Sequence, residues 1–75
     1  MKNRIKECRQ VAGMSQKELS KLTGVFEQAI SHYETGISIP SLEMWEKLAK
    51  ALNVIPAYLV GWSDDPMSQT LEQIA

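Results

Sequence analysis

The chain contains a single cysteine, Cys8, so no internal disulfide can form. Long apolar runs are also missing. The longest, from Val54 to Val60, is interrupted by Pro56 and falls far short of the roughly 20 residues that a membrane span needs. The N-terminus lacks the apolar stretch of a secretory signal. These absences predict a cytoplasmic protein that does not enter a membrane.

Residue types that carry catalysis or bind metals are equally scarce. His32 is the only histidine, and with one cysteine it cannot assemble the usual zinc ligand sets. The sequence offers no nucleophile–base pair and no glycine-rich phosphate loop. We therefore expect no enzymatic activity, no cofactor and no metal site, and interpret Cys8 as a core residue.

The composition that is present suits a small globular domain. With 44 % hydrophobic and 23 % charged residues, the chain can bury a core and does not resemble a disordered tail. We predict one domain over residues 1–62 and a C-terminal tail over 63–75, either a short helix or the start of a linker. A core of this size supplies only a few kcal/mol of net stability, which leaves room for stabilisation by a partner subunit.

Charge is distributed unevenly along the chain, although the net charge is only −1. Residues 1–36 carry six basic and four acidic side chains, whereas residues 37–75 carry two basic and five acidic ones. A basic excess in the first half is what a phosphate-facing surface there requires.

Apolar residues recur at helical spacing, and strand patterns are nearly absent. The pattern predicts an all-α domain of five packed helices. The expected spans are about 3–12, 15–24, 27–35, 41–53 and 56–60. The first helix has an apolar stripe of Ile5, Cys8 and Ala12. The fourth has the strongest periodicity, with Leu42, Trp45, Leu48, Ala49 and Leu52 on one face.

Several helix ends are marked by their residues. Ser15 and Glu18 form a capping box, in which each side chain binds the other residue's backbone N–H. Gly24 supplies the left-handed conformation that ends the second helix, and Asn53 takes that role after the fourth. Ser41 is the expected N-cap of the fourth helix.

Residues 15–36 are the most informative segment. Two short helices hinged at Gly24 have the layout of a helix-turn-helix, whose second helix fits the major groove of duplex DNA. Because Ile30 and Tyr33 point inward, the outward residues of the second helix are Glu27, Gln28, Ser31 and His32. Gln28 is the best candidate base reader, since a glutamine can contact adenine N6 and N7 together. Free N–H groups at the start of the first of these helices, together with the long amide side chain of Gln16, form a natural phosphate site.

Several motifs resemble the lambda-repressor-like, Cro/repressor-type helix-turn-helix family, also called the xenobiotic-response-element family. They are Ile5-Lys6-Glu7-Cys8-Arg9, Ser15-Gln16-Lys17-Glu18-Leu19, Gly24-Val25, Ile30 to Gly36, Pro40 to Glu43 and Leu48 to Val54. The resemblance covers about Lys2 to Gly61. It implies that residues 27–35 form the recognition helix and that Gln16 grips a phosphate. It also favours an ion pair between Arg9 and Glu34 over a phosphate contact by Arg9.

Together, residue pattern and resemblance predict a set of DNA-contacting residues. They are Gln16, Lys17, Phe26, Glu27, Gln28, Ser31, His32, Thr35 and Ser38. Relatives usually carry Ser or Thr in place of Phe26, a basic residue in place of His32, and basic residues in the loop that here holds Ile37 and Ser38. Fewer phosphate contacts lower the affinity for DNA, so we expect weak or strongly dimer-dependent binding.

Two aromatic positions have more than one interpretation. Trp62, with Tyr58, Leu59, Leu71 and Ile74, either forms a homodimer interface or packs the tail against the domain. Phe26 either contacts a thymine methyl, stacks on the neighbouring loop or binds a protein. Lys47 and Lys50 are expected to be solvated.

Two functions follow as expectations. The first is a transcriptional regulator, a repressor of phage or mobile-element type, that binds a palindromic operator in double-stranded DNA as a homodimer. The alternative is a protein–protein module on the same fold, an antirepressor or antitoxin-like partner, with weak or no DNA binding. Phe26, Glu27 and Ile37 favour the alternative because they make the expected DNA face more acidic and more apolar.

Overall fold

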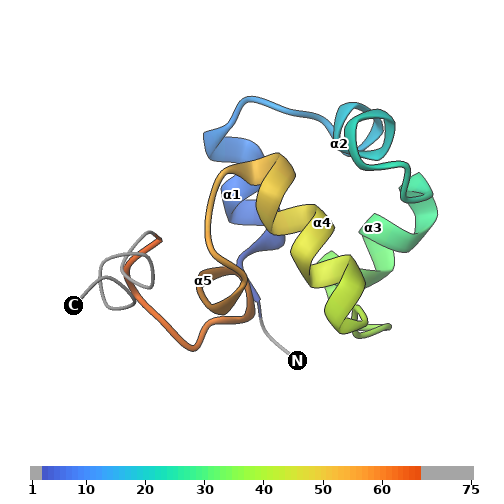
Figure 1. Cartoon of the computed structure of the whole chain (residues 1–75). Coiled ribbons are helices and arrows are strands. Elements are labelled where there is room, and N and C mark those ends of the chain that lie inside the picture. The colour runs from blue at the N-terminus through green and yellow to red at the C-terminus, as the bar shows by residue number, and fades with distance from the viewer. Residues whose placement is uncertain (1–2, 67–75) are drawn as a thin grey trace.

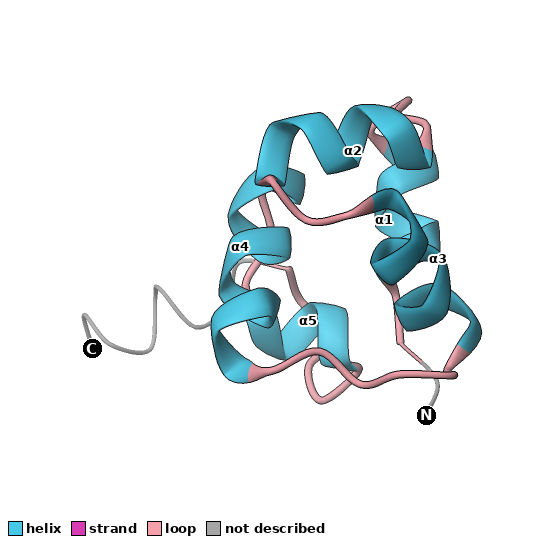
Figure 2. Ribbon diagram, turned by 90° about the vertical axis from the view of Figure 1, so that its right-hand side faces the viewer, coloured by secondary structure: helices cyan, strands magenta, loops and turns pink. Residues whose placement is uncertain are grey.

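The computed structural model describes residues 3–66, and within this range the chain forms five helices and no strand. The helices are α1 (Ile5–Val11), α2 (Gln16–Thr23), α3 (Glu27–Thr35), α4 (Leu42–Leu52) and α5 (Pro56–Val60). As Figures 1 and 2 show, α2 and α5 lie at opposite ends of the domain, with α4 running between them. The predicted all-α fold is confirmed.

Each helix contributes one completely buried side chain to a common core. These five are Ile5, Leu19, Ile30, Leu48 and Leu59. Val25, Trp45, Ala49 and Leu52 surround them, and the predicted core position of Cys8 is confirmed, at 8 % exposed. Burial raises the pKa of the Cys8 thiol, which keeps it protonated and unreactive.

For two residues, the prediction that they belong to the core is wrong. Ala12 is exposed because α1 ends at Val11, and the chain turns away at Ala12 and Gly13 before the apolar stripe can continue. Leu42 is 73 % exposed. It is the first residue of α4, directly after the N-cap Ser41, and its side chain lies in solvent although Trp45 one turn later is buried.

The helix ends follow the predicted capping chemistry. Ser15 Oγ accepts from the Glu18 N–H at 3.0 Å, and the Glu18 carboxylate accepts from the Ser15 N–H at 2.8 Å. The hydrogen bond to the Ser15 backbone lowers the pKa of Glu18, because it favours the charged form. Ser41 caps α4 through the Met44 N–H. Asn53 has φ +60°, the left-handed conformation predicted for it.

Gly24 sets the angle between α2 and α3. Its φ of +77° lies in the left-handed region, where a Cβ atom costs roughly 1–2 kcal/mol. A Cβ atom built at Gly24 would have no described atom within 4 Å. Glycine is therefore favoured here by the backbone conformation and not by lack of space.

We expect Gly24→Ala to lower the free energy of unfolding by about 1 kcal/mol, while Gly24→Asn, which tolerates this conformation, costs less. Urea unfolding of the three proteins measures both differences. Equal stabilities of wild type and Gly24→Ala would show that the turn does not need its left-handed residue.

Candidate nucleic-acid interface

One face of α3 is fixed to the core and the other is open to solvent. Ile30 is fully buried and Tyr33 is packed against the core, as predicted. Glu27 and Gln28 are exposed in the first turn of the helix. Ser31 and His32 are half-buried, so they lie at the margins of the open face and not at its centre. The helix therefore presents Glu27 and Gln28 most prominently.

Thr35 and Ser38 lie near the C-terminal end of α3. The Thr35 hydroxyl donates back to the carbonyls of Ser31 and His32, at 3.0 and 3.3 Å. Thr35 is exposed, and its oxygen can still accept. Ser38 is half-buried, and its backbone N–H donates to the His32 carbonyl, which holds the loop against the end of α3.

The turn between α2 and α3 is held by side chains of α2. Ser20 Oγ donates to the Val25 carbonyl at 2.5 Å, and Thr23 Oγ1 accepts from the Val25 N–H at 3.2 Å. Val25 itself is buried, at 4 % exposed. The backbone that leads into α3 is therefore fixed relative to α2.

Phe26 follows directly as the N-cap residue of α3 and is 84 % exposed. A phenyl ring has no acceptor for the free N–H groups of the first helical turn, in contrast to Ser or Thr. With this exposure the ring is not stacked on a neighbouring loop, which removes one of its three interpretations.

We expect Phe26→Ser to raise the free energy of unfolding by about 1 kcal/mol, because serine can cap the helix and the exposed ring contributes little burial. Thermal unfolding followed by circular dichroism measures the change. A lower melting temperature for Phe26→Ser than for wild type would contradict this interpretation of the cap.

Behind the interface, α1, α2 and α3 are joined by a charged network. Arg9 Nε lies 2.7 Å from Glu34 Oε2, so the implied ion pair is present, with the side chains only 11 % and 3 % exposed. Arg9 also donates to the Met14 carbonyl at 2.9 Å. The hydrogen bond to Glu34 raises the pKa of Arg9 against the opposing effect of burial. The arginine therefore has a structural role.

Gln16 joins the same network. Its Nε2 donates to Glu34 Oε1 at 3.1 Å, which the sequence did not reveal. The contact fixes the amide at the N-terminus of α2, where the resemblance places a phosphate. One Nε2 hydrogen and the amide oxygen remain for other partners. Lys17, the next residue, is exposed.

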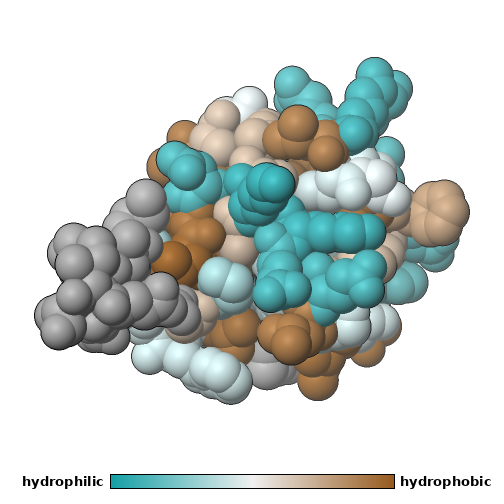
Figure 3. Space-filling view, in the orientation of Figure 1, coloured by the Kyte–Doolittle hydropathy of each residue, from teal (hydrophilic) through white to brown (hydrophobic). Residues whose placement is uncertain are grey.

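The loop between α3 and α4 adds apolar surface beside α3. Ile37 and Ile39 are 72 % and 65 % exposed. Apolar atoms gather along the lower edge of the molecule in Figure 3, near the end where α4 begins in Figure 1. This loop lacks the basic side chains that would approach phosphates directly.

The aromatic surface near α5 differs from its prediction. Leu59 is completely buried, so it cannot line an interface of the folded domain. A helix of five residues gives too little periodicity to predict which side faces inward. Trp62, by contrast, is 85 % exposed. Tyr58 is half-buried. Leu71 and Ile74 lie outside the described residues.

Arg4, which the sequence did not single out, fixes the segment that carries Trp62. Its Nη1 donates to the carbonyls of Tyr58 and Ser63, at 2.8 and 2.6 Å, and its Nη2 lies 2.7 Å from Asp64 Oδ1. The guanidinium also stacks on the Tyr58 ring, 4.3 Å from its centre. These contacts hold residues 58–64 against the start of α1.

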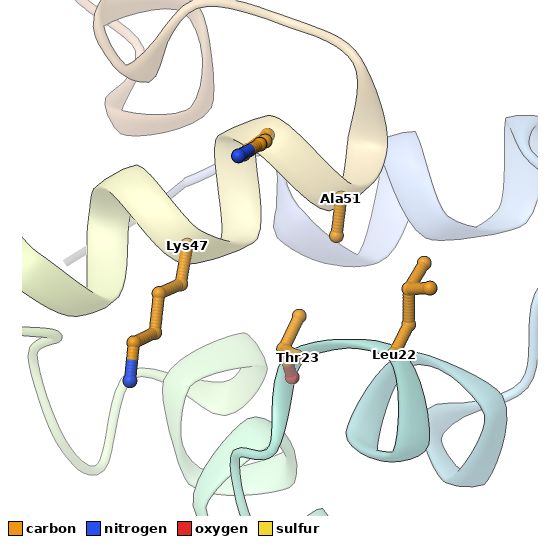
Figure 4. A pocket seen from close by; sticks show the side chains of 5 residues that line it. Leu22, Thr23, Lys47 and Ala51 are labelled. Atoms are coloured by element: carbon orange, nitrogen blue, oxygen red, sulfur yellow. The ribbon is translucent and has the colours of Figure 1, made fainter.

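A shallow groove of about 440 Å³ lies between α2 and α4, lined by Leu22, Thr23, Lys47, Lys50 and Ala51. Figure 4 shows Leu22 and Ala51 pointing toward each other across it. Lys47 and Lys50 are exposed, as predicted for solvated residues, and Lys47 lies 3.7 Å from Glu43. Among residues 3–66 no cluster of His, Cys, Asp and Glu side chains could hold a metal ion.

Two short helices joined by a tight turn, with the open face of the second bearing Glu27 and Gln28, have the arrangement of a helix-turn-helix. The family model described as Helix-turn-helix, HTH_3, matches residues 5–59, and the chain belongs to this family. It is therefore a DNA-binding protein of the transcriptional-regulator class and not an enzyme.

Curated relatives support the same class. The chain is 39 % identical over 54 residues to an uncharacterised HTH-type transcriptional regulator, YgzD, of Bacillus subtilis, covering 72 % of this chain and 82 % of that one. An uncharacterised HTH-type regulator of Archaeoglobus fulgidus is 42 % identical over 53 residues, covering 71 % of this chain and 76 % of the relative. The HTH-type transcriptional regulator ImmR of B. subtilis is 36 % identical over 58 residues, covering 77 % of this chain and 46 % of that protein. No solved structure gives a significant match.

The helices of residues 3–66 are each too short or too polar to cross a bilayer.

Proposed function

We propose that this protein is a repressor of phage or mobile-element type that binds a palindromic operator as a homodimer, with α3 in the major groove. The observation that carries the proposal is the division of α3 into two faces. Ile30 fixes one face in the core, while Glu27 and Gln28 are exposed on the other. A helix supported in this way can enter a groove without leaving its own domain.

Base reading is assigned to the first turn of α3. Gln28 is exposed and neutral, and its amide can bind adenine N6 and N7 together. Glu27 can accept from a cytosine N4 and repels phosphates that approach in a wrong register. Ser31 and His32 are half-buried at the margins of the open face, and we propose that they contact the sides of the groove.

Backbone contacts are assigned to residues around this reader. The N-terminus of α2 offers free N–H groups, and Gln16 is held beside them by Glu34. Lys17 supplies a positive charge, and Thr35 and Ser38 supply hydroxyl groups near the other end of α3. Such contacts set the register of the domain on the duplex without reading its sequence.

For the dimer, we propose that the surface around Trp62 and Tyr58 meets a second copy. Trp62 is exposed although its backbone is hydrogen-bonded to α5, with its N–H on the Ala57 carbonyl at 2.8 Å. A fixed, exposed tryptophan is a favourable interface anchor. Two recognition helices in successive major grooves would lie about 34 Å apart.

Selection of binding sites from a random duplex library tests this function. The enriched sites should be palindromes with half-sites about one helical turn apart. Competition against bulk DNA at low salt measures specificity. If no sequence outcompetes bulk DNA, the proposed function is wrong.

A protein–protein module is the second candidate, with a repressor or antirepressor as partner. The exposure of Phe26, Ile37 and Ile39 beside α3 favours it. In that case Phe26→Ala or Ile37→Ser would abolish function, whereas Gln28→Ala would leave it intact. Gel shifts and pull-downs on the same three variants separate the two candidates.

A further inference from the structure

We infer that Phe26 is a specificity-determining residue that contacts the C5 methyl of a thymine beside the base read by Gln28. The inference rests on the proposed function. It adds that one further base pair of the operator must carry a methyl group in the major groove. It predicts a T·A pair in each half-site, selected by a methyl group and not by a hydrogen bond.

The first support is the position and exposure of the ring. Phe26 immediately precedes α3 and is two residues from Gln28, at the helix end whose residues contact base edges in a helix-turn-helix. The ring is 84 % exposed. The ring is therefore accessible to a partner that approaches the first turn of α3.

The second support is the rigidity of the backbone on both sides. On one side, Val25 is buried and bonded to Ser20 and Thr23. On the other, the Phe26 carbonyl accepts from the Ile30 N–H at 3.1 Å, the first bond of α3. The ring can rotate, but its attachment point cannot move away from the groove that α3 enters.

The third support is the chemistry of the major groove. The edges of the bases present donors and acceptors there, and the only apolar group is the thymine C5 methyl. A phenyl ring cannot bind a donor or acceptor edge without desolvating it, so it discriminates against those edges and favours the methyl. A protein partner is disfavoured, because covering Phe26 would obstruct the approach of the adjacent Gln28 to DNA.

Replacing thymine by deoxyuridine removes this methyl and leaves every hydrogen-bonding atom in place. Starting from the selected site, each thymine is replaced in turn, and the Kd for wild type, Phe26→Ala and Phe26→Leu is measured by fluorescence anisotropy at one salt concentration. Val11→Ala is the matched control, because Val11 is 85 % exposed and belongs to α1, which is not one of the two helices of the helix-turn-helix.

At one thymine per half-site, wild type and Val11→Ala should bind deoxyuridine DNA about fourfold more weakly, the effect of burying one methyl-sized group. Phe26→Ala should bind thymine and deoxyuridine DNA equally, and Phe26→Leu should keep part of the difference. Replacing that T·A pair by 5-methylcytosine·G should cost less affinity than replacing it by unmethylated C·G.

Each failure has a distinct meaning. If no duplex is enriched, the proposed function itself is wrong. Where a specific site exists, two results overturn the inference and leave the proposed function standing. Either no deoxyuridine replacement changes the Kd of wild type, or Phe26→Ala still binds thymine DNA more tightly than deoxyuridine DNA. Loss of a protein partner by Phe26→Ala, with unchanged DNA affinity, also overturns the inference.

Discussion

Replacing Arg9 by methionine is expected to lower the free energy of unfolding by about 3–5 kcal/mol, a large share of the stability of a domain this small. The Glu34 side chain is only 3 % exposed, and its carboxylate accepts from both Arg9 and Gln16. Without the guanidinium, a buried negative charge would lack its counter-ion. Urea unfolding followed by circular dichroism measures the loss.

A double-mutant cycle distinguishes the loss of the ion pair from the cost of an unpaired charge. Arg9→Met combined with Glu34→Leu removes both charges, so the double variant should be more stable than Arg9→Met alone. Lys47→Met is the surface control, because Lys47 and Glu43 are both well exposed and such pairs contribute about 0–1 kcal/mol. An Arg9→Met protein as stable as Lys47→Met would contradict the structural role of the pair.

The second large effect is expected at Gln28. Gln28→Ala should weaken binding to the selected operator by about 1–3 kcal/mol, roughly fivefold to more than a hundredfold, and relax selectivity at one base pair. Replacing the adenine of that base pair by 7-deazaadenine, which lacks the N7 acceptor, should weaken DNA binding by wild type but not by Gln28→Ala. Gel shifts at fixed salt measure both.

Two further variants serve as controls for Gln28. Gln10→Ala, an exposed glutamine on α1, should leave operator affinity unchanged. Lys17→Ala should weaken binding to all sequences alike and reduce the salt dependence, since a phosphate contact carries no sequence information. If wild type and Gln28→Ala have the same sequence selectivity, Gln28 does not read a base.

Local rules predicted most of the backbone. The limits of α3, the capping box at Ser15 and the left-handed Asn53 all follow from short-range chemistry that a sequence displays directly. The same rules failed at Ala12 and Leu42, because periodicity continues past the point where neighbouring helices stop covering it. Burial depends on those neighbours and not only on spacing.

Long-range side-chain contacts were predicted only where the resemblance supplied them. The Arg9–Glu34 pair was expected on that ground, whereas the bond from Gln16 to Glu34 was not. The contacts of Arg4 with Ser63 and Asp64 join residues about 60 positions apart, and no local pattern announces them. The predicted DNA contacts stay predictions, since they depend on a partner.

Amide chemical-shift mapping of the full chain with the selected duplex tests most directly whether the open face of α3 reads DNA. We expect the largest changes at Phe26, Glu27 and Gln28 and at the N-terminus of α2, with little change at the groove around Leu22 and Ala51. Changes confined to that groove or to α4, with α3 unaffected, would contradict the claim that the open face of α3 reads DNA.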